Sequence, residues 1–318
     1  MASEQEKKSI INSIKNWREV RNKKAEEKQP QTTSEKIISF GKTLIGAILI
    51  VMIINGLFLA SFVVPTGSME NTVMTGDFLF VNKFIYGPST PQIVPFLNIP
   101  LPFYKFPGVK DPEVGDVIVF IYPGDRDEVE SKEFQYYLKR CVATAGDTLQ
   151  IIGNKVYVNN KEYYLPENGV YDPRVPDSPA EQLSTFPKGR NYTRNNYGPI
   201  RIPKKGDIIN VDLFNLKEWE YFIRKEGKTV EASNFQLLID GKPTNSYKVE
   251  RDYCFGLGDN RDHSLDSRYW GFIPYDNVVG TPMIVYWSWE SRDEYLNEYS
   301  FIEKVKRIRW SRIFNIIR

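Results

Sequence analysis

Two side chains that lie far apart in the sequence could provide the nucleophile and the base of a hydrolase. Ser68 lies in Val64-Pro65-Thr66-Gly67-Ser68-Met69, directly after a long apolar segment, and Lys139 lies within aromatic and aliphatic residues at 134–143. A serine hydroxyl needs a base, and a lysine serves as one when burial and like charge, here from Arg140, lower its pKa from about 10.4 toward neutrality. Ser68 and Lys139 are therefore candidates for a nucleophile and its base, and whether they lie together stays open at this point. A glycine-serine turn and a surface Lys-Arg pair are the alternatives.

Other catalytic groups are scarce. His263 is the single histidine, so a Ser-His-Asp hydrolase would have only this residue as its base. Cys141 and Cys254 fit no zinc spacing, and whether they pair stays open. Residues 259–262 begin like a calcium loop, but the required glycine and bidentate glutamate are missing. We expect no metal and no cofactor.

The apolar segment before Ser68 predicts a membrane anchor. Residues 43–64 carry no charge, and these 22 residues suffice to cross a hydrocarbon core of about 30 Å. We assign the transmembrane helix to residues 37–64. A cleaved signal peptide is the alternative, although its apolar region is typically about 7–15 residues long. By the positive-inside rule, basic residues before the uncharged segment 43–64 keep the N-terminus in the cytoplasm and place the bulk of the chain outside: Lys7, Lys8, Lys15, Arg18, Arg21, Lys23, Lys24, Lys28, Lys36 and Lys42.

The rest of the chain divides by composition. Residues 1–36 are basic, and the spacing of Ile10, Ile14 and Trp17 fits either a helix on an anionic membrane surface or a solvated tail. Residues 65–147 contain strand patterns, and seven prolines within 84–112 exclude a second membrane span there. This stretch forms either an apolar surface near the bilayer or part of the core.

Residues 148–251 differ from their flanks and read as an inserted β-rich subdomain, with a hairpin at 155–164 and a short helix at 215–227. Strand patterns return in 252–318, and the basic tail there either touches lipid or packs on the core. The net charge is only +2, which gives no reason to expect nucleic acid as a partner.

Five segments in order resemble the sequence boxes of bacterial type I signal peptidases, the membrane-bound leader peptidases with a Ser-Lys dyad. They are PTGSM, GDFLFVNKFIYG, GDVIVFIYP, YYLKRCVATAGDTL and GDNRDHSLDSRYWGFIP, and the resemblance covers residues 62–151 and 254–288. It implies a mainly antiparallel β fold with a signal-peptidase/LexA-like catalytic core and one N-terminal transmembrane helix. It also implies a serine endopeptidase of the bacterial cytoplasmic membrane that removes signal peptides after a small-x-small motif. The partners would be preprotein signal peptides and the lipid bilayer, with export machinery nearby.

The resemblance also implies a role for each matching residue. Ser68 would be the nucleophile and Lys139 the base, the Ser68 amide and Thr66 hydroxyl would form the oxyanion hole, and Ser264 would orient the lysine. The supporting charged residues would be Arg140, Asp259, Arg261, Asp262, Asp266 and Arg268. Apolar pockets for small side chains would be lined by Phe62, Val64, Pro65, Met69, Val73, Leu79, Tyr137 and Leu138.

Two positions depart from the family pattern: Asn71 stands where proline is usual, and Cys141 stands where a small residue is common. Two other functions remain open. One is a Ser-Lys peptidase of the same fold with another target, such as a self-cleaving regulator. The other is a membrane-tethered binding module without catalysis.

Overall fold

A computed structural model describes residues 15–16, 32–90, 93–94, 99–100, 104–233, 235–290 and 300–318. The chain forms two compact units, residues 1–52 and residues 53–318. The predicted surface helix around Ile10, Ile14 and Trp17 lies outside the described residues.

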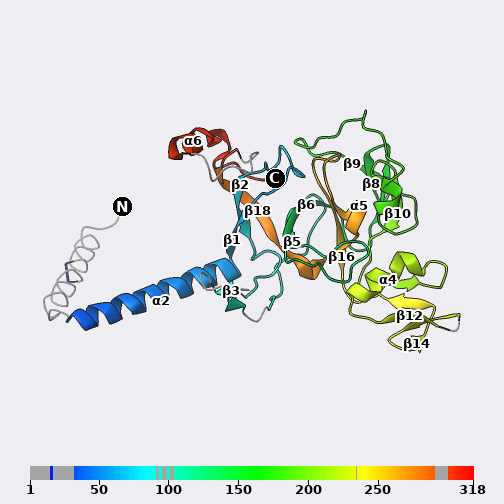
Figure 1. The fold of residues 1–318 in the computed structure, drawn as a ribbon, viewed down its shortest axis with the longest axis horizontal. Coiled ribbons are helices and arrows are strands. Elements are labelled where there is room, and N and C mark those ends of the chain that lie inside the picture. The colour runs from blue at the N-terminus through cyan, green and yellow to red at the C-terminus, as the bar shows by residue number, and fades with distance from the viewer. Residues whose placement is uncertain are drawn as a thin grey trace, which may run out of the picture. The chain divides into compact units, whose positions relative to one another are not determined.

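The apolar N-terminal segment forms helix α2, Thr33–Leu57 (Figure 1). Its stretch Thr33–Ile54 is long and apolar enough to cross a membrane, and the side chains of its most apolar part are not buried. The predicted end of the helix at residue 64 is wrong. Leu59–Val63 is instead strand β1, which pairs antiparallel with β2 (Asp77–Asn82) and places Phe62 opposite Leu79. Hydropathy does not separate an apolar helix from an apolar strand that follows it directly, which explains the error.

Seven strands form the main sheet of the second unit, in the order β1-β2-β18-β5-β6-β16-β17. All neighbouring strands are antiparallel. Besides β1 and β2, the strands are β5 (Val117–Ile121), β6 (Tyr136–Ala143), β16 (Tyr253–Leu257), β17 (Ile273–Pro274) and β18 (Val278–Ser288). Strand β18, from the C-terminal part of the chain, lies between β2 and β5. The sheet therefore combines strands from before and after residues 148–251, which interrupt it in the sequence. This is the mainly antiparallel β fold that we predicted.

Residues 148–251 form small sheets of their own. One sheet has the order β10-β7-β8-β9, and the others are β11-β15 and β12-β13-β14. Their strands are β7 (Thr148–Ile152), β8 (Lys155–Val158), β9 (Lys161–Tyr163), β10 (Tyr197–Arg201), β11 (Ile208–Asn210), β12 (Val230–Ser233), β13 (Gln236–Ile239), β14 (Lys242–Pro243) and β15 (Ser246–Lys248), with helices α3 (Glu181–Ser184) and α4 (Leu216–Lys225). The predicted hairpin and short helix are confirmed as β8–β9 and α4. One hydrophobic core joins these sheets to Val142, Phe255 and Leu257 of the main sheet.

The proline-rich residues 84–112 contain the short antiparallel strands β3 (Ile93–Val94) and β4 (Ile99–Pro100). An isolated bridge joins Ser89 and Lys105 nearby. In this stretch Tyr104, Phe106 and Val109 have exposed side chains, whereas Tyr86 is buried. The stretch therefore supplies both surface and core.

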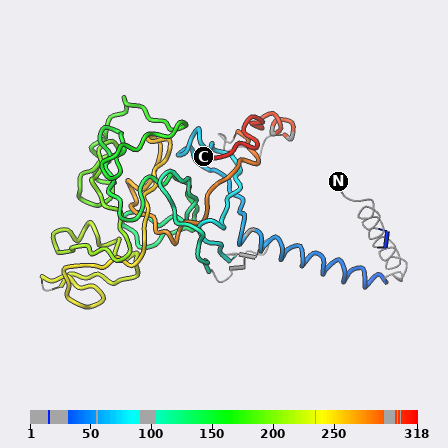
Figure 2. The backbone as a smooth tube through the Cα atoms, turned by 180° about the vertical axis from the view of Figure 1, so that it is seen from behind, coloured from blue at the N-terminus to red at the C-terminus, as the bar shows by residue number. Residues whose placement is uncertain are grey.

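The C-terminal tail packs on the main sheet. The last part of the chain contains α5 (Ser267–Trp270), η1 (Tyr275–Asn277), β18, α6 (Phe301–Lys306) and η2 (Trp310–Arg312). Beyond η2, Ile316 forms a β-bridge with Ile284 of β18. Figure 2 shows this red segment beside the cyan residues that follow β1. The contact is polar as well as apolar, because Arg309 and Arg312 form ion pairs with the fully buried Asp77 at 3.4 and 2.6 Å.

Candidate active site

The fold brings Ser68 and Lys139 together, 71 positions apart in the sequence. Ser68 lies in the turn between β1 and β2, and Lys139 lies within β6. Lys139 Nζ lies 2.6 Å from Ser68 Oγ and donates a second hydrogen bond to the Leu138 carbonyl oxygen at 3.0 Å. A 2.6 Å contact is short enough for direct proton transfer between the amine and the hydroxyl.

The surroundings of Lys139 favour its neutral form. Its side chain is 4% exposed, and Nζ lies 5.8 Å from the Tyr137 ring centroid and 6.0 Å from that of Trp270. Burial lowers the pKa of Lys139 to about 8, with Asp266 acting in the opposite sense and Arg268 in the same sense as burial. The repulsion that we attributed to Arg140 therefore comes from Arg268. Arg140 follows Lys139 on the strand, so its side chain points to the opposite face of the sheet.

Arg140 and Asp259 form a buried ion pair that contacts the turn after Ser68. Arg140 Nε and Nη2 donate to the two Asp259 carboxylate oxygens at 2.8 and 2.7 Å, and Thr72 Oγ1 donates to Asp259 at 2.6 Å. Arg140 also donates to the carbonyl oxygens of Gly115 and Arg318. This pair thus fastens the turn after Ser68 to β6 and to the C-terminal tail.

The other predicted charged residues form a second buried network. Arg268 Nε and Nη2 donate to Asp266 at 2.8 Å each, and Arg268 Nη2 also donates to the Arg261 carbonyl oxygen at 2.7 Å. Arg261 Nε donates to the Gly258 carbonyl oxygen at 3.1 Å. Asp262 accepts the backbone N–H of Asp172 from the inserted residues at 2.6 Å. Arginine donors thus hold the chain of residues 258–268 in shape.

The two predicted partners of the dyad differ in their placement. Thr66 Oγ1 lies 3.5 Å from Ser68 Oγ, so its hydroxyl is beside the nucleophile. Ser264 is buried, but its hydroxyl donates to the Leu265 carbonyl oxygen at 3.4 Å, and within the described part of the chain no hydrogen bond joins it to Lys139. Ser264 nevertheless lies close to Ser68, because a Cβ added at Gly258 would meet Ser264 Oγ at 2.2 Å and the Ser68 carbonyl oxygen at 2.5 Å.

Asn71, the departure from the family pattern, has a φ of 73°. Asparagine tolerates this left-handed conformation, whereas the proline ring fixes φ near −65°. The turn after Ser68 therefore has a shape here that proline could not adopt.

A groove of about 710 Å³ opens at the dyad. Phe62, Val64, Pro65, Met69, Val73, Leu79, Tyr137 and Leu138, the residues predicted for the apolar pockets, all line it. Sequence reasoning missed Val63, Val119, Gln135, Tyr136, His263 and Leu265, which also line it. Val119 was missed because it reaches the groove as the cross-strand partner of Leu138. Which strands pair in the sheet cannot be read from the sequence of either strand.

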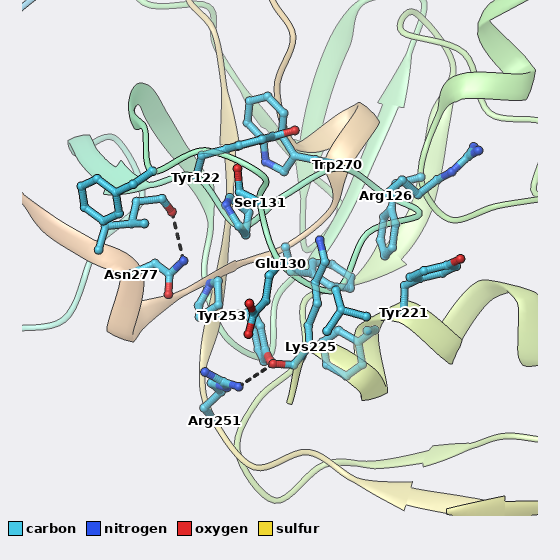
Figure 3. Close-up of a pocket in the computed structure, with 18 of the residues that line it drawn as sticks. Tyr122, Arg126, Glu130, Ser131, Tyr221, Lys225, Arg251, Tyr253, Trp270 and Asn277 are labelled. Carbon is cyan, nitrogen blue, oxygen red and sulfur yellow. Dashed lines mark hydrogen bonds between the residues drawn. The ribbon is translucent and has the colours of Figure 1, made fainter. Parts of the chain in front are cut away.

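A second, smaller hollow of about 280 Å³ lies between the end of β5, α4 and strands β16 and β17 (Figure 3). Lys225 lines it, and Lys225 Nζ donates to the Gly124 and Asp125 carbonyl oxygens at 3.1 and 3.0 Å. Burial lowers the pKa of Lys225 to about 8, as it does for Lys139. Among the described residues Lys225 bonds only to these carbonyl oxygens, so it provides a control for the effect of burial without a neighbouring hydroxyl.

The remaining candidates show no catalytic geometry. His263 is exposed on the rim of the groove, and among residues that the structure describes it forms no hydrogen bond with Ser68. Cys141 and Cys254 are buried free thiols. The described residues contain no group of three or more His, Cys, Asp or Glu side chains able to hold a metal ion.

Comparison with known proteins gives a consistent result. The family described as "Signal peptidase, peptidase S26" matches residues 37–287. A protein named Signal peptidase I from Helicobacter pylori is 28% identical over 287 residues, which cover 88% of this chain and 93% of that protein. Another of the same name from Pseudomonas fluorescens is 30% identical over 281 residues, covering 85% and 80%. A crystal structure of a signal peptidase I from Enterococcus faecalis is 22% identical, with a TM-score of 0.25, and covers 55% of this chain and 98% of that one. The family match and the sequence relatives establish that this chain belongs to the signal peptidase family, peptidase S26, and within it to the bacterial type I signal peptidases, which are serine peptidases.

Proposed function

We propose that this protein removes signal peptides from exported preproteins by means of a Ser68-Lys139 dyad. The observation that carries the proposal is the 2.6 Å contact between Lys139 Nζ and Ser68 Oγ in a site where the lysine is 4% exposed. Family membership supports the reaction class, and the apolar groove beside the dyad supports a peptide substrate.

The mechanism begins with neutral Lys139. With a pKa of about 8, roughly a tenth of the lysine is neutral at pH 7. It takes the proton of the Ser68 hydroxyl while the oxygen attacks the carbonyl carbon before the scissile bond. The Ser68 N–H and the Thr66 hydroxyl donate to the oxyanion that forms. Protonated Lys139 then gives the proton to the leaving amine, and the acyl-enzyme is hydrolysed by water that Lys139 deprotonates in the same way.

The groove supports cleavage after a small-x-small motif. Its floor includes Val73 and Leu79, both fully buried and already packed into the core, so the space beside Ser68 is shallow. A shallow apolar pocket accepts alanine and excludes large side chains. Substrates with leucine or phenylalanine at either small position are expected to be cleaved about 5-fold to 150-fold more slowly, since overpacking costs about 1–3 kcal/mol.

Helix α2 supports anchoring in the cytoplasmic membrane, and the basic residues before its apolar part support an N-terminus in the cytoplasm and a catalytic unit outside. External protease added to spheroplasts should digest the catalytic unit. Full protection would contradict the orientation.

The test of the dyad is cleavage of a preprotein by the purified full chain in detergent. Ser68→Ala and Lys139→Ala should each abolish cleavage, whereas Lys225→Met, which removes another buried lysine with a lowered pKa, should retain it. Activity of either dyad variant within tenfold of wild type would refute the mechanism. A folded wild-type chain that cut no preprotein would favour the binding module or a peptidase with another target.

A further inference from the structure

The peptide group between Gly67 and Ser68 carries the N–H that the proposed mechanism directs at the oxyanion. The Gly67 carbonyl oxygen of this group accepts two hydrogen bonds, from the Glu70 N–H at 3.0 Å and from Asn260 Nδ2 at 3.1 Å. In a planar trans peptide the C=O and N–H point in opposite directions. Fixing the carbonyl of Gly67 therefore fixes the direction of the Ser68 N–H.

Within the described part of the chain, the Ser68 N–H itself is not used. No hydrogen bond among the described residues has it as donor, although the neighbouring carbonyls of Gly67 and Ser68 both accept bonds. A donor left free beside a nucleophile, on a peptide group whose carbonyl is held by two bonds, is the arrangement that an oxyanion hole requires.

Asn260 holds this turn at two points. Its backbone N–H donates to the Ser68 carbonyl oxygen at 3.1 Å, and its side-chain amide donates to the Gly67 carbonyl oxygen and lies 3.5 Å from Glu70 Oε2. The Asn260 side chain is 8% exposed, so water does not compete freely for these acceptors. Because Asn260 bonds to both Gly67 and Ser68, it controls the tilt of the peptide plane between them.

The loop that carries Asn260 is held on its other side by the inserted residues. The Val170 N–H donates to the Asp259 carbonyl oxygen at 2.8 Å, and the Arg261 N–H donates to the Val170 carbonyl oxygen at 2.9 Å. These bonds form a parallel bridge between Val170 and Asn260. Asn260 thus lies between the turn that carries Ser68 and the insertion, and hydrogen bonds hold its segment on both sides.

We propose that Asn260 is a positioning residue for the oxyanion hole: its side-chain amide fixes the plane of the Gly67–Ser68 peptide so that the Ser68 N–H faces the developing oxyanion. The proposal rests on the proposed function, because it assigns the Ser68 N–H to that reaction. Asn260 acts through this peptide and takes part in no proton transfer.

Two substitutions separate the hydrogen-bond role from mere space filling. Asn260→Ala removes the donor, and Asn260→Asp keeps the size but places a carboxylate oxygen against the Gly67 carbonyl and Glu70. We expect kcat to fall about tenfold for alanine and about a hundredfold for aspartate, with KM within about twofold of wild type. A residue that only filled space would give the opposite order, because aspartate is the better replacement in shape.

Inhibitor binding provides the readout specific to the oxyanion. A small-x-small peptide aldehyde adds to Ser68 and places an oxyanion in the hole, whereas the cleaved signal peptide does not. The affinity for the aldehyde should fall by the same factor as kcat/KM in each variant, and the affinity for the product should stay unchanged. In Asn260→Ala the pH at which kcat/KM levels off should also be unchanged, because that substitution adds no charge near Lys139.

Asn277 provides the matched control. Its Nδ2 donates to the Ile121 carbonyl oxygen at 3.0 Å on the border of the second hollow, a bond of the same type outside the groove (Figure 3). Asn277→Ala and Asn277→Asp should keep wild-type kcat and aldehyde affinity. If wild type cut no preprotein or Ser68→Ala remained active, the proposed function itself would fail, before any Asn260 variant was compared.

The proposal is overturned if the aspartate variant is at least as active as the alanine variant, or if KM rises while kcat holds. Unfolding midpoints in urea are measured for every variant. If Asn260→Asp does not fold, Asn260→Ser takes its place and must show lower kcat and lower aldehyde affinity at unchanged KM. Any other result for Asn260→Ser also overturns the proposal.

Discussion

Replacing Lys139 by methionine should abolish activity and, at neutral pH, stabilise the fold. The folded-state pKa of Lys139 is about 8, against 10.5 for an unperturbed lysine. Between these values the unfolded chain binds a proton that the folded chain lacks, so wild-type stability rises with pH across this window. Below pH 8 the full penalty of about 3 kcal/mol applies, from 2.5 pKa units at about 1.36 kcal/mol each. Methionine does not titrate, so the variant escapes this penalty.

The magnitude of the effect follows from the contacts of the amine. Losing the hydrogen bonds to Ser68 Oγ and the Leu138 carbonyl oxygen costs about 1 kcal/mol each, at any pH. The variant should therefore be more stable than wild type by about 1 kcal/mol at pH 7. This difference should shift by more than 2 kcal/mol toward wild type by pH 10, as the buried amine loses its penalty.

Urea unfolding of both proteins at pH 7, 8, 9 and 10 measures this difference, and titrating groups common to both cancel. Activity gives an independent readout. Wild-type kcat/KM should rise about tenfold per pH unit below pH 8 and then level off, because only the neutral amine is a base. A stability difference that did not change with pH, or that moved toward the variant, would refute the burial argument. A flat rate from pH 5 to 9 would refute the role of Lys139 as base.

Three further substitutions test the surroundings of the dyad. Thr66→Val keeps the shape but removes the hydroxyl beside Ser68, so kcat should fall at least about tenfold at unchanged KM, with Thr66→Ser as the control that restores it. Asp259→Asn leaves Arg140 buried without its counter-charge and should lower the free energy of unfolding by about 3 kcal/mol in urea, and a change below 1 kcal/mol would contradict the role of that pair. His263→Ala should keep kcat/KM within about threefold, because truncating an exposed side chain on the rim of the groove removes few contacts. A hundredfold loss would instead indicate that the histidine is the base.

The sequence predicted the chemistry of this site better than its supporting contacts. Ser68, Lys139 and the eight pocket residues could be named in advance because they lie within or a few residues from short, recognisable segments. Asn260 was seen only as part of a possible cation loop, since its contacts with Gly67 and Ser68 depend on how two distant turns meet. The contact of Val170 with residues 259–261 was invisible for the same reason, as was the C-terminal tail bonding to Asp77 and Arg140. The end of the membrane helix was misplaced because an apolar helix runs into an apolar strand.

Lys139 and Arg140 show how one strand gives two adjacent basic residues opposite properties. Side chains alternate between the two faces of β6. On one face Arg140 pairs with both oxygens of Asp259, which keeps Arg140 charged. On the other face Lys139 contacts Ser68 and two aromatic rings, and no carboxylate of the described chain bonds to it. A bare carboxylate about 6 Å from a partly buried ammonium would stabilise the charge by about 3 kcal/mol, which is as large as the effect of burial.

The nearby carboxylates of Asp259 and Asp266 would therefore keep Lys139 protonated if they stood alone, and both do raise its pKa. Each is instead bound by its own arginine. Burial would raise the pKa of Asp266, but the charge and hydrogen bonds of Arg268 lower it, so that carboxylate stays ionised as half of an ion pair. The same Arg268 charge lowers the pKa of Lys139. Buried ion pairs add little net stability to a fold. Here they let a polar scaffold surround Ser68 without giving its lysine a counter-ion, which is the condition that the proposed role of Lys139 as a base requires.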